Sequence, residues 1–249
     1  KYTPRDPKSI PPRQWLLGTH LIRKFVSLTV SPGGLGKSSL ALVEALSMAT
    51  GQELLPDMKI YGDKPLRVQY WNGEDPQEEN DRRIEAAIIS YGLKQESLTD
   101  TFGSDSGREQ SMILARMVKG DIEIDEEFFI DLENEMIESG TDVLVLDPFV
   151  STHEVNENDN SAIDAVVKRL GKLADRTNAA IELVHHVRKP SAGTKDQTDV
   201  NDARGAGALL GGVRSARVLN VMSEDIAEAV GVPSDIRKRH FSVSDGKAN

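Results

Sequence analysis

The sequence predicts an α/β protein whose central sheet is largely parallel and flanked by helices. Strand-forming segments alternate with segments of helical periodicity along most of the 249 residues, a pattern typical of strands that are connected through helices. Residues 142–147 are almost continuously apolar, as expected of a strand that is covered on both faces. A glycine-rich turn at residues 31–38 joins a strand pattern directly to a helix pattern. Together these observations favour an open, doubly covered sheet.

Elements of this fold can be assigned in chain order. Residues 1–12 are polar and rich in proline, so we expect an N-terminal arm or linker there and a single domain over residues 13–249. Glycines stand where three of the helical patterns stop, as helix C-termini require. We expect strands at residues 25–30, 66–71, 112–115, 142–147, 180–185 and 216–221. Helices are expected at residues 39–50, 77–91, 128–137, 161–177 and 205–212, and loops at 153–160 and 187–202.

Composition and charge restrict the class of protein. The contents of 38% hydrophobic and 28% charged residues are those of a soluble globular chain. No apolar run approaches the roughly 20 residues of a membrane span, and the chain has no cysteine for disulfides or thiolate metal sites, so we expect a cytoplasmic protein without membrane contact. The net charge of −10 argues against a protein coated with nucleic acid, although a basic channel remains compatible with it.

The turn at residues 31–38, Ser-Pro-Gly-Gly-Leu-Gly-Lys-Ser, has the pattern of a phosphate-binding loop (P-loop). Its glycines let successive backbone N–H groups point at one anion beside a helix N-terminus. Lys37 would then contact the β- and γ-phosphates, and Ser38 would supply a hydroxyl for Mg²⁺. The alternative is a glycine-rich turn that contains Gly-Lys-Ser by coincidence, and Ser31 replaces the usual first glycine. The expected nucleotide-binding residues are Ser31, Gly33, Gly34, Leu35, Gly36, Lys37, Ser38 and Ser39.

Two carboxylates follow predicted strands. Asp147 ends the apolar run, where a carboxylate can hold the water shell of Mg²⁺ opposite Ser38, as in a Walker B motif; alternatively it only begins a turn before Pro148. Glu74 ends another strand, and the carboxyl ends of parallel strands meet at one edge, so it could orient or deprotonate the attacking water. Helix capping is the competing role; we favour catalysis for Glu74 and capping for Asp75.

His185 and His186 end a further strand. Because side chains alternate along a strand, at most one of them is expected to sense the γ-phosphate while the other is structural. Arg204 and Arg214 flank a Gly/Ala-rich segment, and either could be an arginine finger, although a surface ion pair is the better interpretation of a lone arginine. A run of acidic residues from Asp121 to Glu138 contains no Lys or Arg and is expected to be a solvated helix face with its lead-in.

These motifs, in this order, resemble RecA-like ATPases of the RepA type, which include plasmid hexameric replicative helicases and phage- or primase-associated ATPases. The resemblance extends over roughly residues 12–247. The segments that resemble the family are Ser31–Ser38, Trp71–Pro76, Leu144–Pro148, His185-His186 and Arg204–Ala208.

The resemblance implies a RecA-like P-loop core that binds ATP and Mg²⁺ and assembles with itself into a ring, expected to be a hexamer, around single-stranded DNA. By position, Lys37 and Ser38 would bind phosphate and Mg²⁺, Glu74 would be the catalytic base and Asp147 the Walker B acid. His186 would be the γ-phosphate sensor, with His185 second. Arg214 would be the finger acting across subunits, with Arg204 close behind.

We therefore expect Mg²⁺-dependent ATP hydrolysis by a ring-forming helicase or single-stranded-DNA translocase in the replication of a plasmid, phage or mobile element. In a ring, the loop at residues 187–202 would line the channel; acidic residues offset its basic ones, and it lacks aromatic residues for base stacking. The alternatives are a RecA- or KaiC-like ATPase in repair or regulation, and an assembly module held together by nucleotide. The basic residues of the loop are Arg188, Lys189 and Lys195, offset by Asp196, Asp199 and Asp202.

Overall fold

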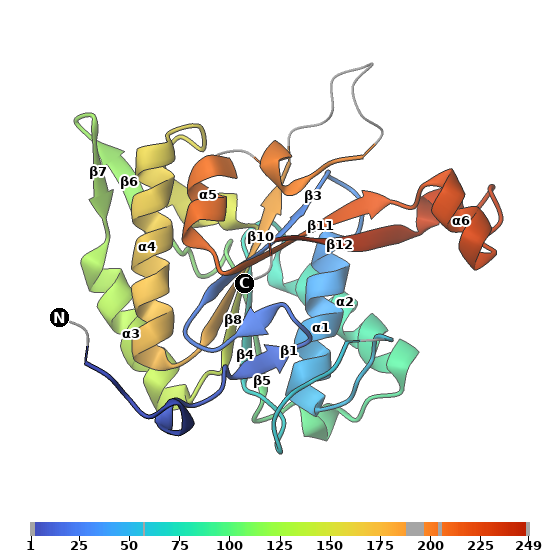
Figure 1. The fold of residues 1–249 in the computed structure, drawn as a ribbon, viewed down its shortest axis with the longest axis horizontal. Coiled ribbons are helices and arrows are strands. Elements are labelled where there is room, and N and C mark those ends of the chain that lie inside the picture. Colours follow the sequence, from blue (N-terminus) through green and yellow to red (C-terminus); the bar gives the residue numbers. More distant parts are fainter. Residues whose placement is uncertain (1–2, 57, 188–196, 204–205, 248–249) are drawn as a thin grey trace.

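A central sheet of seven strands organises the chain in a computed structural model that describes residues 3–56, 58–187, 197–203 and 206–247 (Figure 1). The strands follow the order β12-β11-β3-β10-β8-β4-β5. All neighbours are parallel except β11 and β12, which are antiparallel. This confirms the predicted α/β class with a mostly parallel sheet. The strands are β3 (Val26–Ser31), β4 (Val68–Asn72), β5 (Phe102–Ser106), β8 (Val143–Asp147), β10 (Ala180–His186), β11 (Ser215–Val221) and β12 (Phe241–Lys247).

Helices cover both faces of this sheet. The period of two along β8 shows how: Leu144 and Leu146 pack with α3, α4 and α5 on one face, whereas Val143 and Val145 pack with α1 and α2 on the other. Every residue of β8 is buried, as its continuous apolar sequence predicts. The helices are α1 (Lys37–Thr50), α2 (Gln77–Tyr91), α3 (Glu126–Ser139), α4 (Asn160–Thr177), α5 (Ala206–Gly212) and α6 (Glu224–Val230).

Several shorter elements lie around the sheet. Residues 3–14 are exposed and contain one 3-10 turn, and none of the described helices is long and apolar enough to cross a membrane. The small strands are β1 (Trp15–Leu17), β2 (Leu21–Ile22), β6 (Ala115–Val118), β7 (Asp121–Ile124) and β9 (His153–Glu154). The 3-10 helices are η1 (Pro7–Ser9), η2 (Gln95–Ser97), η3 (Phe149–Thr152), η4 (Val200–Asp202) and η5 (Arg237–Arg239).

Two predictions about local structure are wrong. The strand expected at residues 112–115 begins only at Ala115 and continues to Val118, because its pairing partners β7 and β9 lie beside that later stretch. The loop expected at residues 153–160 starts with β9, which pairs with β6. The strand β9 depends on long-range pairing with β6, whereas β6 also forms a hairpin with its neighbour β7.

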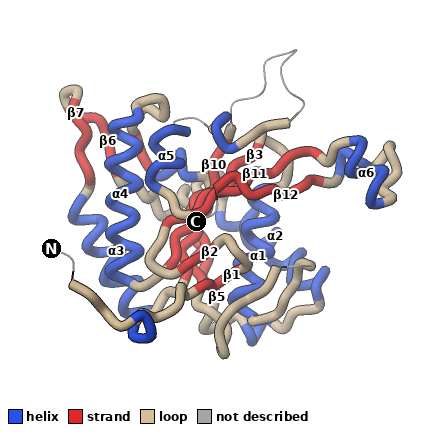
Figure 2. The backbone as a smooth tube through the Cα atoms, in the orientation of Figure 1, coloured by secondary structure: helices blue, strands red, loops and turns tan. Residues whose placement is uncertain are grey.

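Beyond the helix-covered part of the sheet, β11 and β12 run out side by side to α6 (Figure 2). Their antiparallel pairing joins the end of β11 at Val221 to the start of β12 at Phe241. Parallel strands end at a common edge, so Val221 and Phe241 lie at the same sheet edge as the end of β3, where the glycine-rich turn begins.

Candidate active site

The glycine-rich turn lies between β3 and α1, as a P-loop requires. Gly34 and Gly36 have φ angles of 82° and 89°, the left-handed region that favours glycine. Gly36 is the N-cap of α1, and no side chain among the described residues caps that helix. The first N–H groups of α1 therefore stay open to an anion, as they do in phosphate sites at helix N-termini.

Lys37, Ser38 and Asp147 form a polar cluster beside this turn, in which Lys37 and Asp147 are buried and Ser38 is partly exposed. Lys37 is 6% and Asp147 1% exposed, and the Asp147 carboxylate accepts hydrogen bonds from the Ser38 hydroxyl and from the Tyr70 hydroxyl, the latter at 2.7 Å. Burial raises the pKa of Asp147, while these hydrogen bonds and the charge of Lys37 oppose the rise. Burial lowers the pKa of Lys37, and Asp147 and Glu74 oppose that change. A carboxylate beside a hydroxyl and a P-loop lysine fits Mg²⁺ held with nucleotide phosphates.

Glu74 lies in a turn that Asn72 holds in place. The Asn72 side-chain oxygen accepts the backbone N–H groups of Glu74 at 3.0 Å and Asp75 at 2.8 Å, an arrangement typical of Asx turns. The Gly73 N–H donates to the Asp147 carbonyl at 2.9 Å, which joins the ends of β4 and β8. The Glu74 side chain remains 57% exposed, so its carboxylate is accessible to a water molecule.

The predicted capping role of Asp75 is wrong. Pro76 is the N-cap of α2 and no side chain caps that helix in the part of the chain that the structure describes. Instead, the Asp75 carboxylate pairs with the guanidinium of Arg83 at 2.7 Å. The Asp75 carboxylate is thus engaged by a charge-assisted pair with an arginine two turns into the helix.

His185 and His186 point to opposite faces of β10, as the strand period predicts. His185 is buried and contacts the Phe149 ring edge-on, with its Nε2 3.8 Å from a Glu157 oxygen. His186 instead approaches Glu74, with 3.8 Å between Nε2 and Oε1. Burial and the charge of Lys37 lower the pKa of His186, whereas Glu74 raises it. His186 therefore shares an environment with the P-loop lysine and the predicted catalytic base.

Of the two arginine candidates, only Arg214 is among the described residues, and it does not join this cluster. Arg204 lies outside the described residues, as do Arg188, Lys189, Lys195 and Asp196 of the expected channel loop. Arg214 directly precedes β11; its N–H donates to the Val26 carbonyl at 2.8 Å and its guanidinium covers the Phe25 ring at 4.8 Å. Since β3 and β11 are parallel, this is the sheet edge opposite the P-loop. A role of Arg214 in a neighbouring subunit stays a prediction.

The other acidic groups that the structure describes carry no sign of a metal site. Among the described residues, no cluster of three His, Cys, Asp or Glu side chains could hold a metal ion. Most of the acidic run is exposed on β7 and α3, as predicted. Two of its members pair with α4: Glu126 with Arg169 at 2.9 Å and Glu133 with Arg176 at 3.2 Å.

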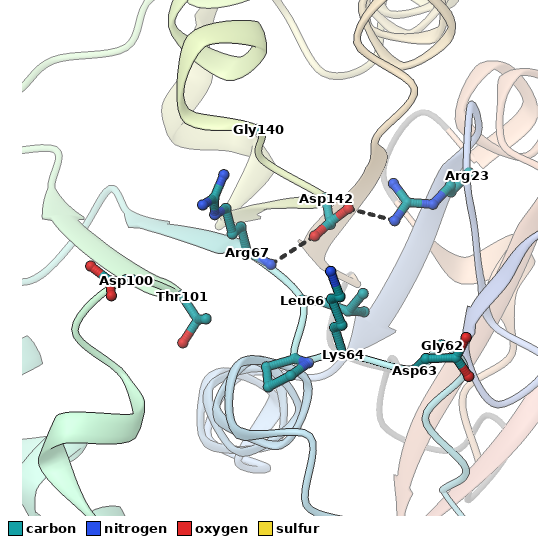
Figure 3. Close-up of a pocket in the computed structure, with 11 residues that line it drawn as sticks. Arg23, Gly62, Asp63, Lys64, Leu66, Arg67, Asp100, Thr101, Gly140 and Asp142 are labelled. Atoms are coloured by element: carbon teal, nitrogen blue, oxygen red, sulfur yellow. Dashed lines mark hydrogen bonds and ion pairs between the residues drawn. The ribbon is translucent and has the colours of Figure 1, made fainter.

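A separate pocket of about 650 Å³ opens at the sheet edge opposite the P-loop. Figure 3 shows the Asp142 carboxylate between Arg23 and Arg67. It accepts the Arg67 backbone N–H at 2.8 Å and pairs with the Arg23 guanidinium. The Arg67 guanidinium in turn donates to the Ser139 carbonyl at 2.8 Å. The two arginines thus already have partners within the protein, and the pocket is distinct from the nucleotide edge.

Sequence reasoning missed Tyr70 and Asn72. Both lie on β4 just before Glu74, Tyr70 holding Asp147 and Asn72 holding the Glu74 turn. An asparagine two residues before the expected base was the available signal for the turn. Nothing local to Tyr70 indicates its contact with Asp147, which lies 77 residues away.

Comparison with protein-family models matches residues 3–192 to the AAA domain. The matched range contains the P-loop, Glu74, Asp147 and both histidines. Arg214, β11, α6 and β12 lie beyond it.

Proposed function

The chain belongs to the AAA domain family and is a P-loop ATPase, and from this premise we propose that it is a Mg²⁺-dependent, ring-forming motor of the RepA type that moves along single-stranded DNA. One observation carries the hydrolytic part of the proposal: Glu74 and His186 lie 3.8 Å apart, next to Ser38 and the buried Lys37 and Asp147. A site that only binds nucleotide has no need of an accessible carboxylate at this point.

Each residue has a distinct task in the proposed reaction. The Gly34–Gly36 turn and the N-terminus of α1 bind the phosphates, and Lys37 lies against the β- and γ-phosphates. Ser38 and Asp147 are the groups that would hold Mg²⁺, which supplies neutralisation of phosphate charge when bound. Glu74 orients the attacking water and takes its proton.

The proposed role of His186 follows from the hydrogen bonds that a neutral imidazole ring can make. With a lowered pKa, the ring is neutral near pH 7 and can donate one hydrogen bond to the γ-phosphate while Glu74 remains an acceptor. Loss of the γ-phosphate would remove that bond and release the strand end. The ring assembly and the DNA substrate rest on the order of the motifs and their resemblance to RepA-type ATPases.

The test is steady-state ATP hydrolysis over a range of protein concentrations, with and without single-stranded DNA. Glu74→Gln should lower turnover on the order of 100-fold or more, since general-base catalysis contributes about 10²–10⁴-fold, while ATP binding persists. Glu78→Gln is the matched control, because Glu78 lies on α2 with an 81% exposed side chain paired to Arg82. Turnover in this control should equal that of the wild type.

The outcomes separate the alternatives. Turnover that rises with both DNA and protein concentration supports an assembled motor. Turnover indifferent to DNA refutes the motor and favours a regulatory or repair ATPase. Unchanged behaviour of Glu74→Gln refutes catalysis at this carboxylate and favours a nucleotide-dependent assembly module.

A further inference from the structure

The aromatic ring of Phe241 lies against the P-loop. Phe241 is the first residue of β12, and its Cε1 atom is 3.7 Å from the position that a Cβ atom would take on Gly36. It pairs with Val221, the last residue of β11. The ring is partly exposed. An apolar, accessible ring thus sits beside the first turn of the phosphate site.

Strand order fixes which end of a nucleotide would reach this ring. The reacting end lies toward Asp147 and His186, which end β8 and β10, and toward Glu74, two residues beyond the end of β4. These three strands all lie on one side of β3. β11 and β12 lie on the other side of β3. A nucleotide whose phosphates occupy the loop with the γ-phosphate toward Glu74 therefore extends its nucleoside end toward Phe241.

We propose that Phe241 is the platform on which the nucleobase of the bound nucleotide stacks. The inference rests on the proposed function, because the P-loop must hold the phosphates for the base to reach the ring. A stacked base is recognised through its π-face, which all bases have, so this contact supports adenine and guanine nucleotides alike. It also assigns a ligand contact to β12, which lies beyond the matched AAA domain region.

The backbone around Phe241 holds the platform in position. The Met222 N–H donates to the His240 carbonyl at 3.1 Å, directly before the ring. The Arg237 guanidinium donates to the Met222 carbonyl at 2.6 Å, which ties the turn before β12 to the end of β11. A platform fixed before the ligand arrives loses little conformational entropy on binding.

The experiment compares two probes, ATP and inorganic tripolyphosphate, by calorimetric titration in Mg²⁺. Tripolyphosphate carries the phosphates without a base. Phe241→Ala should weaken ATP binding about ten-fold, as expected for loss of one stacking contact, and leave tripolyphosphate affinity unchanged. Val243→Ala, on the same strand with a side chain that is exposed, should change neither affinity.

Other results overturn the inference, and they differ from failure of the proposed function. Unchanged ATP affinity in Phe241→Ala, or equal loss for both probes, would show that the ring does not hold the base. A wild-type protein that binds neither probe would instead refute the nucleotide site itself. If Phe241→Ala fails to fold, Phe241→Trp provides a second test. ATP, but not tripolyphosphate, should change the tryptophan fluorescence of this variant relative to the wild type. Identical responses to both probes would contradict base stacking.

Discussion

Replacement of Arg217 by methionine should destabilise the protein strongly. The Arg217 side chain is 3% exposed and makes a two-pronged ion pair with Glu44 of α1, at 2.6 and 2.5 Å. Its Nε donates to the Thr29 hydroxyl of β3 at 2.8 Å. Glu182 of β10 lies 4.0 Å from the same guanidinium and pairs with His20 at 2.9 Å. One arginine therefore compensates buried negative charge on two elements, α1 and β10.

The size of the effect follows from burial. Removing one partner of a buried ion pair costs about 3–5 kcal/mol, because the other charge stays buried without compensation. For a chain of this length each kcal/mol lowers the melting temperature by about 2–4 °C. The melting temperature of Arg217→Met should therefore fall by roughly 6–20 °C.

The loss of stability in Arg217→Met should depend on pH in a definite direction. Burial alone would raise the pKa of Glu182, but His20, Arg217 and the Thr29 hydroxyl together lower it below its ordinary 4.5. A lowered pKa in the folded state stabilises the fold above the unfolded value, and this stabilisation is lost as the pH falls through the folded value. The difference between wild type and Arg217→Met should thus be full at neutral pH and shrink in acid, below about pH 4.5.

Thermal and urea unfolding followed by circular dichroism would measure the loss of stability in Arg217→Met. Arg176→Met is the matched control: Arg176 also pairs with a glutamate, Glu133 at 3.2 Å, but its side chain is 58% exposed, so less than about 1 kcal/mol should be lost. The double variant Arg217→Met/Glu44→Leu should recover part of the stability, because it removes the orphaned charge. Equal losses in Arg217→Met and Arg176→Met would refute the reasoning.

Three further predictions concern the active site. Lys37→Ala should abolish ATP binding in equilibrium titrations, and retained affinity would remove the P-loop assignment. Tyr70→Phe should move the acid limb of the ATPase pH profile to higher pH, because the Tyr70 hydroxyl lowers the pKa of Asp147 and only the carboxylate form binds Mg²⁺; an unmoved limb would contradict this. Arg214→Ala should keep ATP binding but lose turnover on the order of 10³-fold, and mixing it with Glu74→Gln subunits should restore some hydrolysis. Absence of recovery in the mixture would argue against a finger acting across subunits.

The sequence predicts the interior of the sheet and the long helices well, and its edges poorly. Residues 142–147 carry a continuous apolar pattern because the strand is covered on both faces, and residues 77–91 carry a helical period because one face of the helix packs on the sheet. The edge strand β5 reads Phe-Gly-Ser-Asp-Ser and β12 reads Phe-Ser-Val-Ser-Asp-Gly-Lys. Both are rich in Gly, Ser and Asp, and Gly and Asp are depleted in strands. Their pairing with β4 and β11 comes from long-range contacts that local patterns do not encode.

The same distinction between local pattern and long-range contact applies to the candidate active site. Glu74, Asp147 and both histidines lie at or just after predictable strand ends, and Lys37 and Ser38 begin the helix after the glycine-rich turn. Sequence reasoning placed all of them there. The residues that hold the site, by contrast, act over long separations: Arg217 reaches Glu44 across 173 positions. No sequence spacing predicts that such residues pair, so the buried ion pair is evident only from the three-dimensional structure.

The helix α1 explains why that buried charge matters to the site. Lys37 and Ser38 occupy its first turn and Glu44 lies seven residues later, about 10 Å further along the axis. On β3, Val26, Leu28 and Val30 face the α4 side, so the intervening Thr29 faces α1, where Arg217 and Glu182 meet it. The same helix and strand thus carry the predicted phosphate-binding residues at one end and the ion-pair network further along. Because ligand binding stabilises only the folded arrangement, the network and the nucleotide hold the same junction between β3 and α1 from opposite ends.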